Sequence, residues 1–325
     1  MSTLHITNGD SAGDKLRRIV KGTVSITADP LHEGPAPPVD GDAWYEVRAR
    51  FLANSDATHE DIKTTLASWD RAIVDGYGAG DIVLWFEHDL FDQLALIRTL
   101  DLIAGPQRTA LPANVSLICI DRFPGVDRFI GLGQLSDDQL ETLIGTERAV
   151  TPDQYALASE AWRAFRSPDP SELLRIALGP TTALPFLGDA LRRFFAEFPS
   201  AANGLSRTEE LALGALQEGG MDGGALFVAT QAHEERPFLG DSVFFGTLRA
   251  LASARVPLVT ISGGSEALDL RSHVMAITDA GREVLAGRSD HIALDGIDRW
   301  RGGVHLTGRD TALWRWDARS ETLVS

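Results

Sequence analysis

The chain has 325 residues, of which 44% are hydrophobic and 23% charged, as in packed globular proteins rather than disordered ones. Its formal net charge of -16 repels polyanions, which argues against broad binding to nucleic acid or to anionic membranes. No run of about 18 apolar residues and no secretory signal is found. The single cysteine, Cys119, suits a reducing compartment, so we expect a soluble cytoplasmic protein.

The N-terminal part alternates short apolar segments, rich in Val and Ile, with helical patterns. This alternation predicts an α/β fold with a parallel sheet covered by helices on both faces. A proline-rich stretch, 34–38, is expected to be a loop. The predicted strands are Leu4–Thr7, Thr23–Ala28, Ile82–Glu87 and Val115–Ile120, and the predicted helices are Ala12–Val20, Ala43–Leu52, His59–Asp75 and Leu90–Ile103.

The rest of the chain changes character twice. From Ser136 to Pro199 the pattern is helical, with Ser136 and Thr151 as predicted N-caps. After residue 203, two helices, two strands and a further helix suggest a winged-helix module, and a tail with strand-like pieces follows. The predicted organisation is therefore an α/β domain (1–135), a helical segment (136–203), a winged-helix-like module (204–290) and a β-rich tail (291–325).

Reactive or ligating side chains follow each of the first three predicted strands. Ligands of open parallel sheets bind outside the carboxyl ends of the strands, near the point where the strand order reverses. Core packing alone does not require polar residues at these positions, so their convergence predicts a shared site. The three stretches are Asn8-Gly9-Asp10-Ser11, Asp29-Pro30-Leu31-His32-Glu33 and Glu87-His88-Asp89-Leu90-Phe91-Asp92-Gln93.

The stretch from Gly9 to Gly13 connects a strand to a helix, and two interpretations of it stay open. Its glycines and the free N–H groups of the helix start favour a bound phosphate or carboxylate, with Ser11 as a donor. Alternatively, Asp10 or Ser11 simply caps the helix. The spacing excludes a Walker loop. Gly-Asp-Ser also resembles the nucleophile motif of a class of hydrolases, but Asp290-His291 has the wrong spacing for their Asp-x-x-His.

The two histidines at the strand ends come with carboxylates nearby. Such a set could bind a divalent metal or supply a general acid and base, although each residue alone also fits a capping or packing role. A structural zinc site is not expected, since no cysteine lies near and no His-x-x-x-His pair exists. A second group of candidates that could clamp an anion consists of Arg122, Arg128, Arg192 and Arg193, with the last two expected on a solvent-exposed helix face.

The winged-helix-like module does not have the composition of a DNA reader. Residues 204–290 contain seven arginines, no lysine and twelve acidic residues, and the helix that would enter the major groove, 241–249, is mostly apolar. A DNA reader needs a basic face and polar groups for base edges. DNA binding is therefore not expected, and this module is predicted to pack against its own chain, a protein partner or a second copy.

Several strings of the sequence resemble a bacterial family catalogued as domain of unknown function 1835. The resemblance covers nearly the whole chain but implies no particular activity. It falls on the same strand-end stretches that the residue chemistry singles out. The strings are His5–Ser11, Asp29–Pro35, Leu84–Gln93, Leu184–Leu187, Asn203–Glu209 and Gly302–Leu306.

Two hypotheses follow from the sequence. The first is an enzyme that acts on a small phosphorylated or carboxylated ligand, such as a nucleotide, by hydrolysis or transfer with a divalent metal. The second is a metabolite-sensing adaptor that signals to a protein partner through the winged-helix-like module. The enzyme hypothesis assigns catalysis to His32, His88 and Asp10, ligand binding to Asn8, Gly9, Ser11, Gly13, Asp92, Gln93 and Arg122, and the metal to Asp29, Glu33 and Asp89.

Overall fold

The computed structural model describes residues 3–53, 57–76, 80–105, 114–263, 269–309 and 313–325. The chain forms two compact units, the first made of residues 1–191 with 300–304 and the second of residues 192–299 with 305–325. The predicted helical segment, 136–203, is thus shared between both units, and the predicted tail, 291–325, contributes five residues to the first.

The first unit is built on a five-stranded sheet in the order β2-β1-β4-β5-β6. The first four of these strands run parallel, and β6 is antiparallel to β5. The four predicted strands are confirmed, while β6 lies in a segment that was predicted to be helical. The strands are β1 (Leu4–Thr7), β2 (Thr23–Ile26), β4 (Ile82–Glu87), β5 (Val115–Ile120) and β6 (Arg148–Ala149).

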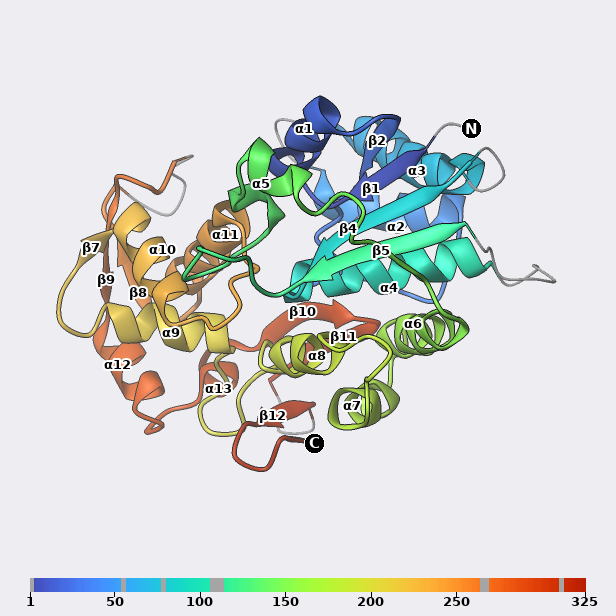
Figure 1. Ribbon diagram of the computed structural model, residues 1–325. Helices are drawn as coiled ribbons and strands as arrows, with labels where there is room; N and C mark the ends of the chain where they lie inside the picture. Colours follow the sequence, from blue (N-terminus) through green and yellow to red (C-terminus); the bar gives the residue numbers. More distant parts are fainter. Residues whose placement is uncertain (1–2, 54–56, 77–79, 106–113, 264–268, 310–312) are drawn as a thin grey trace. The chain divides into compact units, whose positions relative to one another are not determined.

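Helices cover both faces of this sheet, as the alternating pattern predicted (Figure 1). On one face, α1 (Asp10–Ile19) and α5 (Asp137–Glu141) enclose a core that includes Trp85 and Ile118. On the other face, α3 (His59–Gly76) and α4 (Leu90–Ala104) pack, with α2 (Asp42–Leu52) and α6 (Pro152–Phe165) outside them. Because β4 is buried on both faces, it is apolar at every position up to its final glutamate.

The strand order places one reversal point in the sheet. From β1 the chain moves to β2 on one side and then to β4 on the other, so the reversal lies between β1 and β4. This is where ligands of open parallel sheets bind, outside the carboxyl ends of the strands. The residues at that point are Asn8, directly after β1, and Glu87, the last residue of β4.

The proline-rich stretch contains a short strand where a loop was predicted. β3 (Gly34–Pro35) pairs in parallel with β10 (Ile297–Gly302), through Arg301 and Gly302. The strand has two residues and lies at the edge of its sheet, where a proline removes no ladder hydrogen bond. Sequence pattern alone could not supply the partner strand, since it lies more than 250 positions away.

The helical part of the first unit begins as predicted. Ser136 caps α5, Thr151 caps α6, and both form a capping box with a glutamine three residues on. Pro152 occupies the first turn of α6, where its missing N–H costs nothing. A 3-10 helix η1 (Leu132–Gln134) precedes α5, α7 (Ser171–Leu178) follows α6, and α8 (Leu187–Phe195) leads into the second unit.

The second unit combines helices with a three-stranded antiparallel sheet in the order β7-β9-β8. The predicted helices and strands of this part are present, and the sequence pattern missed β7, α10 and α13, the last of which opens the tail that was predicted to be β-rich. A separate hairpin closes the chain. In order the elements are α9 (Arg207–Ala215), β7 (Met221–Asp222), α10 (Gly223–Ala232), α11 (Asp241–Ser253), β8 (Val259–Ile261), β9 (Val274–Ile277), α12 (Asp279–Leu285), α13 (His291–Asp295), β11 (Val304–Gly308), β12 (Arg315–Asp317) and β13 (Thr322–Val324).

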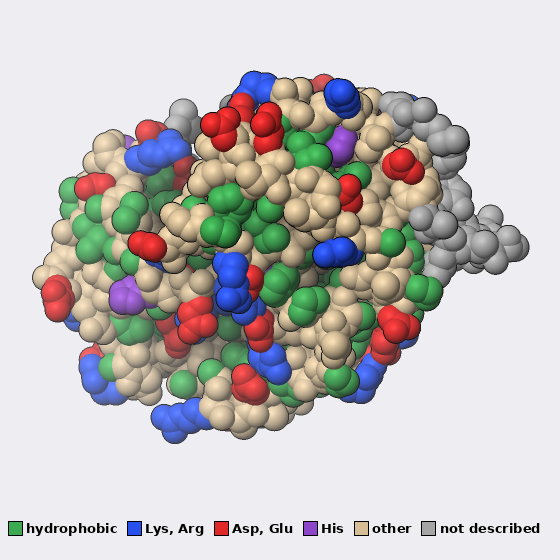
Figure 2. All heavy atoms as spheres, in the orientation of Figure 1, with side chains coloured by type: hydrophobic (Ala, Val, Ile, Leu, Met, Phe, Trp, Pro, Cys, Tyr) green, Lys and Arg blue, Asp and Glu red, His purple; other side chains and the backbone are tan. Residues whose placement is uncertain are grey.

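None of the helices in the described ranges has the length and apolar character needed to cross a membrane. Charged side chains of both signs are interspersed on the face drawn in Figure 2, where no continuous basic area is visible.

A buried ion pair secures the loop after β2. The guanidinium of Arg48 has no exposed surface, lies 2.5 Å from Asp29, and also donates to the carbonyls of Pro30, Glu33 and Pro35. We expect Arg48→Met to lower the free energy of unfolding by about 3–5 kcal/mol, because it leaves the Asp29 carboxylate buried and uncompensated. Urea unfolding followed by circular dichroism measures this loss.

Arg50 in the same helix supplies the control. Its pair with Glu46 is solvent-exposed, so Arg50→Met should change the free energy of unfolding by less than about 1 kcal/mol. Equal small losses in both variants would show that the Arg48 pair does not anchor the loop.

Candidate ligand site at the strand ends

The reversal point of the sheet is closed by a hydrogen bond between the ends of two elements. Asn8 Nδ2, directly after β1, donates to Asp92 Oδ2 in the first turn of α4 at 2.6 Å. The other oxygen of the same carboxylate accepts the backbone N–H of Glu87 at 3.1 Å. Asp92 therefore connects the end of β1, the end of β4 and the start of α4.

Three carboxylates meet at this point. One oxygen from each of Glu87, Asp89 and Asp92 lies within 4.8 Å of the other two. Asp89 caps α4 by accepting the N–H of Asp92 at 2.9 Å, and both aspartates are buried. A capping acid and a strand-end acid are ordinary features alone, but three acids this close repel one another unless protons or a cation intervene.

The environment raises the pKa of all three carboxyls. Burial raises the pKa of Asp92 to about 6, against the opposing hydrogen bonds from Asn8 and Glu87. Burial, then the negative charge of Asp92, holds the pKa values of Asp89 and Glu87 well above their usual range. Near neutral pH, in the absence of a cation, the cluster therefore retains protons that exposed carboxyls would have lost.

The segment that contains η1 forms a wall beside the cluster. The N–H of Leu132 donates to the Glu87 carboxylate, and Gly131 approaches that carboxylate so closely that any Cβ there would collide with it. Lys15 of α1 holds the same segment in place by donating to the carbonyls of Gly133 and Leu135 at 2.6 and 2.7 Å. Glu87 is thus fixed from outside its own strand.

The loop between β1 and α1 leaves its helix start free of side-chain caps. The N-cap is Gly9, which has φ +72 and offers no capping side chain. Neither Asp10 nor Ser11 caps the helix, because Asp10 is an exposed first helical residue and Ser11 Oγ donates to the Gly133 carbonyl. A Cβ at Gly13 would lie 2.6 Å from Ile26 Cδ1, so this glycine permits close packing of α1 on β2.

Two of the three predicted metal ligands are engaged in ion pairs of their own. Asp29 pairs with buried Arg48, and Glu33 pairs with Arg301 at 3.2 Å. Both are held by arginines, and neither belongs to the three-carboxylate group. Of the predicted ligands, Asp89 belongs to it, together with Asp92, which was predicted to bind ligand.

The two predicted catalytic histidines are buried among aromatic rings. His32 packs against Phe91, which lies in the first turn of α4, and their ring centroids are 5.4 Å apart. His88 packs against Phe129 and Phe186 at 5.9 and 6.3 Å. The strands before them, β2 and β4, lie on opposite sides of β1. Each histidine borders the start of α4, but they contact different rings.

The remaining predicted residues have separate surroundings. Gln93 Nε2 donates to the Glu87 carbonyl at 2.6 Å, which places it beside the cluster. Arg122 is exposed and pairs with its neighbour Asp121. Arg193 was expected on a solvent face, but it is half-buried, because it pairs with the carboxylates of Glu197 and Glu234.

Glu87 is the site residue that the sequence hypotheses did not assign. It ends a strand that was interpreted as apolar core, and its role depends on the two aspartates that follow it within five residues. A carboxylate as the last residue of a doubly buried strand was the signal available in the sequence, because burial without a partner is costly for such a group.

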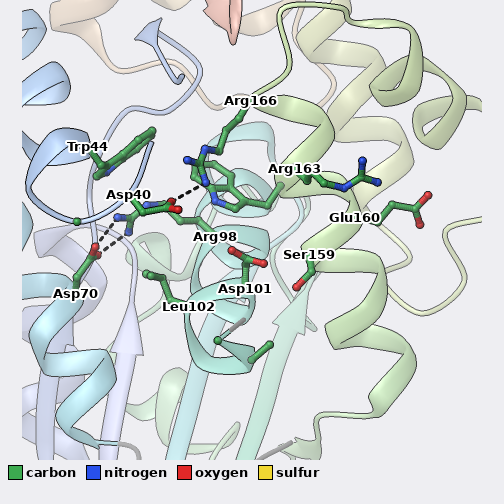
Figure 3. Close-up of a pocket in the computed structure, with 14 residues that line it drawn as sticks. Asp40, Trp44, Asp70, Arg98, Asp101, Leu102, Ser159, Glu160, Arg163 and Arg166 are labelled. Carbon is green, nitrogen blue, oxygen red and sulfur yellow. Dashed lines mark hydrogen bonds and ion pairs between the residues drawn. The ribbon is translucent and has the colours of Figure 1, made fainter. Parts of the chain in front are cut away.

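A separate cavity of about 640 Å³ lies among the helices of the first unit (Figure 3). Its basic side chains already have acidic partners: Arg98 pairs with Asp70, and Arg166 with Asp40. Both guanidiniums also lie within 6.0 Å of the rings of Trp44 and Trp162. These pairs and stacked rings account for the residues as packing between helices.

No protein-family model and no curated protein matches the chain. Among solved structures, it is similar to the DNA-binding, cleavage and re-ligation domain of topoisomerase II from Plasmodium falciparum, with 12% identity and a TM-score of 0.48. The alignment covers 87% of this chain and 48% of that one, so the chain spans about half the length of that structure. A likeness of this degree supports no statement about function.

The raised pKa values predict a protein that is more stable in mild acid than in base. An unfolded aspartate has a pKa near 3.9, so protonation of Asp92 stabilises the fold fully below about pH 4. That contribution is lost as the pH rises through the folded pKa of about 6. We expect Asp89→Asn, which keeps an N-cap oxygen, to raise the free energy of unfolding at about pH 8 by roughly 1–3 kcal/mol.

Urea unfolding at about pH 8 and about pH 5 tests this expectation, and the gain should be smaller at the lower pH. The control is Asp153→Asn, an exposed acid in the first turn of α6 that should give no gain. An Asp89→Asn protein no more stable than the wild type at the higher pH would contradict the account of the cluster.

Proposed function

We propose that the protein binds a divalent cation at Glu87, Asp89 and Asp92, and that this cation holds a small phosphorylated or carboxylated ligand for hydrolysis or transfer. The observation that carries the proposal is the meeting of three carboxylates at the reversal point of a parallel sheet. Carboxylate oxygens are the ligands that Mg²⁺, Mn²⁺ and Ca²⁺ prefer.

The oxygen separations suit a cation of this kind. Oxygens on opposite sides of Ca²⁺ are about 4.6–5.2 Å apart and those around Mg²⁺ are closer, because the metal–oxygen distances are about 2.3–2.6 and 2.0–2.1 Å. The three carboxylate oxygens, all within 4.8 Å of one another, need little movement to surround one ion. Asn8 and the Leu132 N–H hold two of these carboxylates in place.

Charge explains why the cation comes first. An anionic ligand approaching three acids in a chain of net charge -16 is repelled, and a bound cation reverses that repulsion locally. The uncapped start of α1 then offers N–H groups to the ligand from the neighbouring loop. A cation held by Glu87, Asp89 and Asp92 would displace their protons and keep the three carboxylates ionised as its ligands.

The second candidate function is an adaptor that works through the second unit. We propose a winged-helix module for α9 to β9, supported by the β7-β9-β8 antiparallel sheet and the three helices α9, α10 and α11. Val228 of α10 is 68% exposed and Val274 of β9 is 50% exposed, which offers a partner some apolar contact. Two exposed valines fall short of the broad apolar patch that a stable protein interface needs, so we favour the ligand-binding proposal.

Two further assignments belong with this proposal. We propose membership of the family catalogued as domain of unknown function 1835, because the strings of this chain that resemble the family include the strand-end residues described above. We also propose a cytoplasmic location, on the basis of a single cysteine that lies half-buried in β5.

Thermal unfolding in the presence of Mg²⁺, Mn²⁺ and Ca²⁺ tests the cation site. At a concentration about 100 times its dissociation constant, a bound ion stabilises the wild type by about 2.7 kcal/mol, which appears as a higher Tm. Glu87→Gln keeps an oxygen for the Leu132 N–H but removes a charged ligand, so we expect its cation-dependent shift to be largely lost. Inorganic phosphate or a nucleotide should add a second shift only when the cation is present.

Glu141→Gln, at an exposed position of α5, is the matched control and should keep the full cation shift. If no cation raises the Tm, or if Glu87→Gln responds like the wild type, the proposed metal-dependent function is wrong. A protein that responds to no cation and no anion would favour the adaptor.

A further inference from the structure

A small pocket of about 210 Å³ lies in the first unit on the face of the sheet that α4 covers. Leu117 and Cys119 of β5 form its floor, since alternate residues of a strand share a face. Leu96 of α4 and the loop residues Leu184 and Phe186 complete its apolar walls. An enclosed apolar cavity of about 150 Å³ can hold a benzene-sized molecule, so the apolar part of this pocket has room for a small hydrocarbon group.

One charged side chain borders this apolar pocket. Arg148 of β6 stands directly opposite Leu117 in the antiparallel register, so its side chain projects to the same face as Leu117. Arg148 is solvent-exposed, and no acidic side chain in the described part of the chain pairs with it. In the larger cavity of this unit, by contrast, Arg98 and Arg166 both have acidic partners.

Two polar groups complete the rim. Gln154 uses its Oε1 to accept the N–H of Thr151 in the capping box of α6, which leaves its amide N–H groups for the pocket. Gln93 also lines the pocket, and its amide donates to the Glu87 carbonyl. The charged and donor groups at the rim are therefore suited to a ligand with hydrogen-bond acceptor atoms, and none of the residues that line the pocket is acidic.

We propose that this pocket binds a small organic acid, with its carboxylate on Arg148 and its apolar body between Leu96, Leu117, Leu184 and Phe186. The volume accommodates a benzene ring or an aliphatic chain of about six or seven carbons, at about 30 Å³ for each water-sized group. The guanidinium matches a carboxylate with two parallel N–H donors. The pocket should therefore prefer a ligand with one carboxylate and a compact apolar group.

The pocket adjoins the carboxylate cluster without sharing its acids. Gln93 contacts the backbone of Glu87, and Phe186 packs on His88, so the two sites share walls. Binding of the organic acid needs no cation, because Arg148 supplies the positive charge. The inference thus goes beyond the proposed metal-dependent function and does not depend on it.

Calorimetric titration of the full chain with benzoate and hexanoate, in the presence of a metal chelator, tests the proposal. We expect both acids to bind the wild type, benzyl alcohol and hexanol to bind more weakly, and phenyl phosphate to reveal whether a phosphate can replace the carboxylate. Arg148→Gln should weaken benzoate binding roughly 10- to 100-fold and leave benzyl alcohol binding unchanged.

Two further variants complete the design. Leu184→Trp fills the pocket and should abolish binding of the acids and the alcohols alike, with its fold checked by circular dichroism. Arg163→Gln removes an exposed arginine paired with Glu172 and should bind benzoate like the wild type. The proposal is overturned if neither acid binds, if Arg148→Gln binds benzoate as tightly as the wild type, or if phenyl phosphate binds while both carboxylates do not.

Discussion

The hydrogen bond from Asn8 to Asp92 is the contact on which the candidate site depends. It fixes the end of β1 to the first turn of α4, and Asp92 also accepts the N–H of Glu87 at the end of β4. Such charge-assisted bonds contribute about 1.5–3 kcal/mol each, but only if the carboxylate is ionised. These hydrogen bonds also hold Asp92 in a buried position beside Glu87 and Asp89. Burial and the two neighbouring acids oppose the ionisation that the hydrogen bonds require.

The proposed role of the cluster follows from this opposition between the hydrogen bonds, which favour an ionised Asp92, and its burial, which does not. Structural N-caps and strand ends seldom need two buried aspartates and a half-buried glutamate so close together, and amides of the same shape would pack there without the repulsion. Destabilising groups kept in a defined geometry are typical of functional sites, where a ligand supplies the missing compensation. A divalent cation would compensate all three carboxylates at once.

The sequence indicated the strand ends where the candidate carboxylates lie, but not which carboxylates come together there. Apolar strands alternating with helices were enough to locate the strand ends, because burial on both faces leaves a clear pattern. The sequence did not indicate which carboxylates form the cluster, because the ion pairs that engage the others were not visible in it. Glu33 pairs with Arg301, 268 positions away, and Asp29 pairs with Arg48. Glu87 was overlooked because its strand is otherwise apolar. Local patterns report caps and strands, whereas ion pairs over long distances depend on the tertiary fold.

Proton release on cation binding tests the central claim most directly. Calorimetric titration of Mn²⁺ near neutral pH, repeated in buffers with different ionisation enthalpies, gives the number of ions bound and of protons released. Because the pKa values of Glu87 and Asp89 are held well above their usual range, we predict one ion per chain and release of at least one proton. Absence of binding, or binding without proton release, would contradict the account.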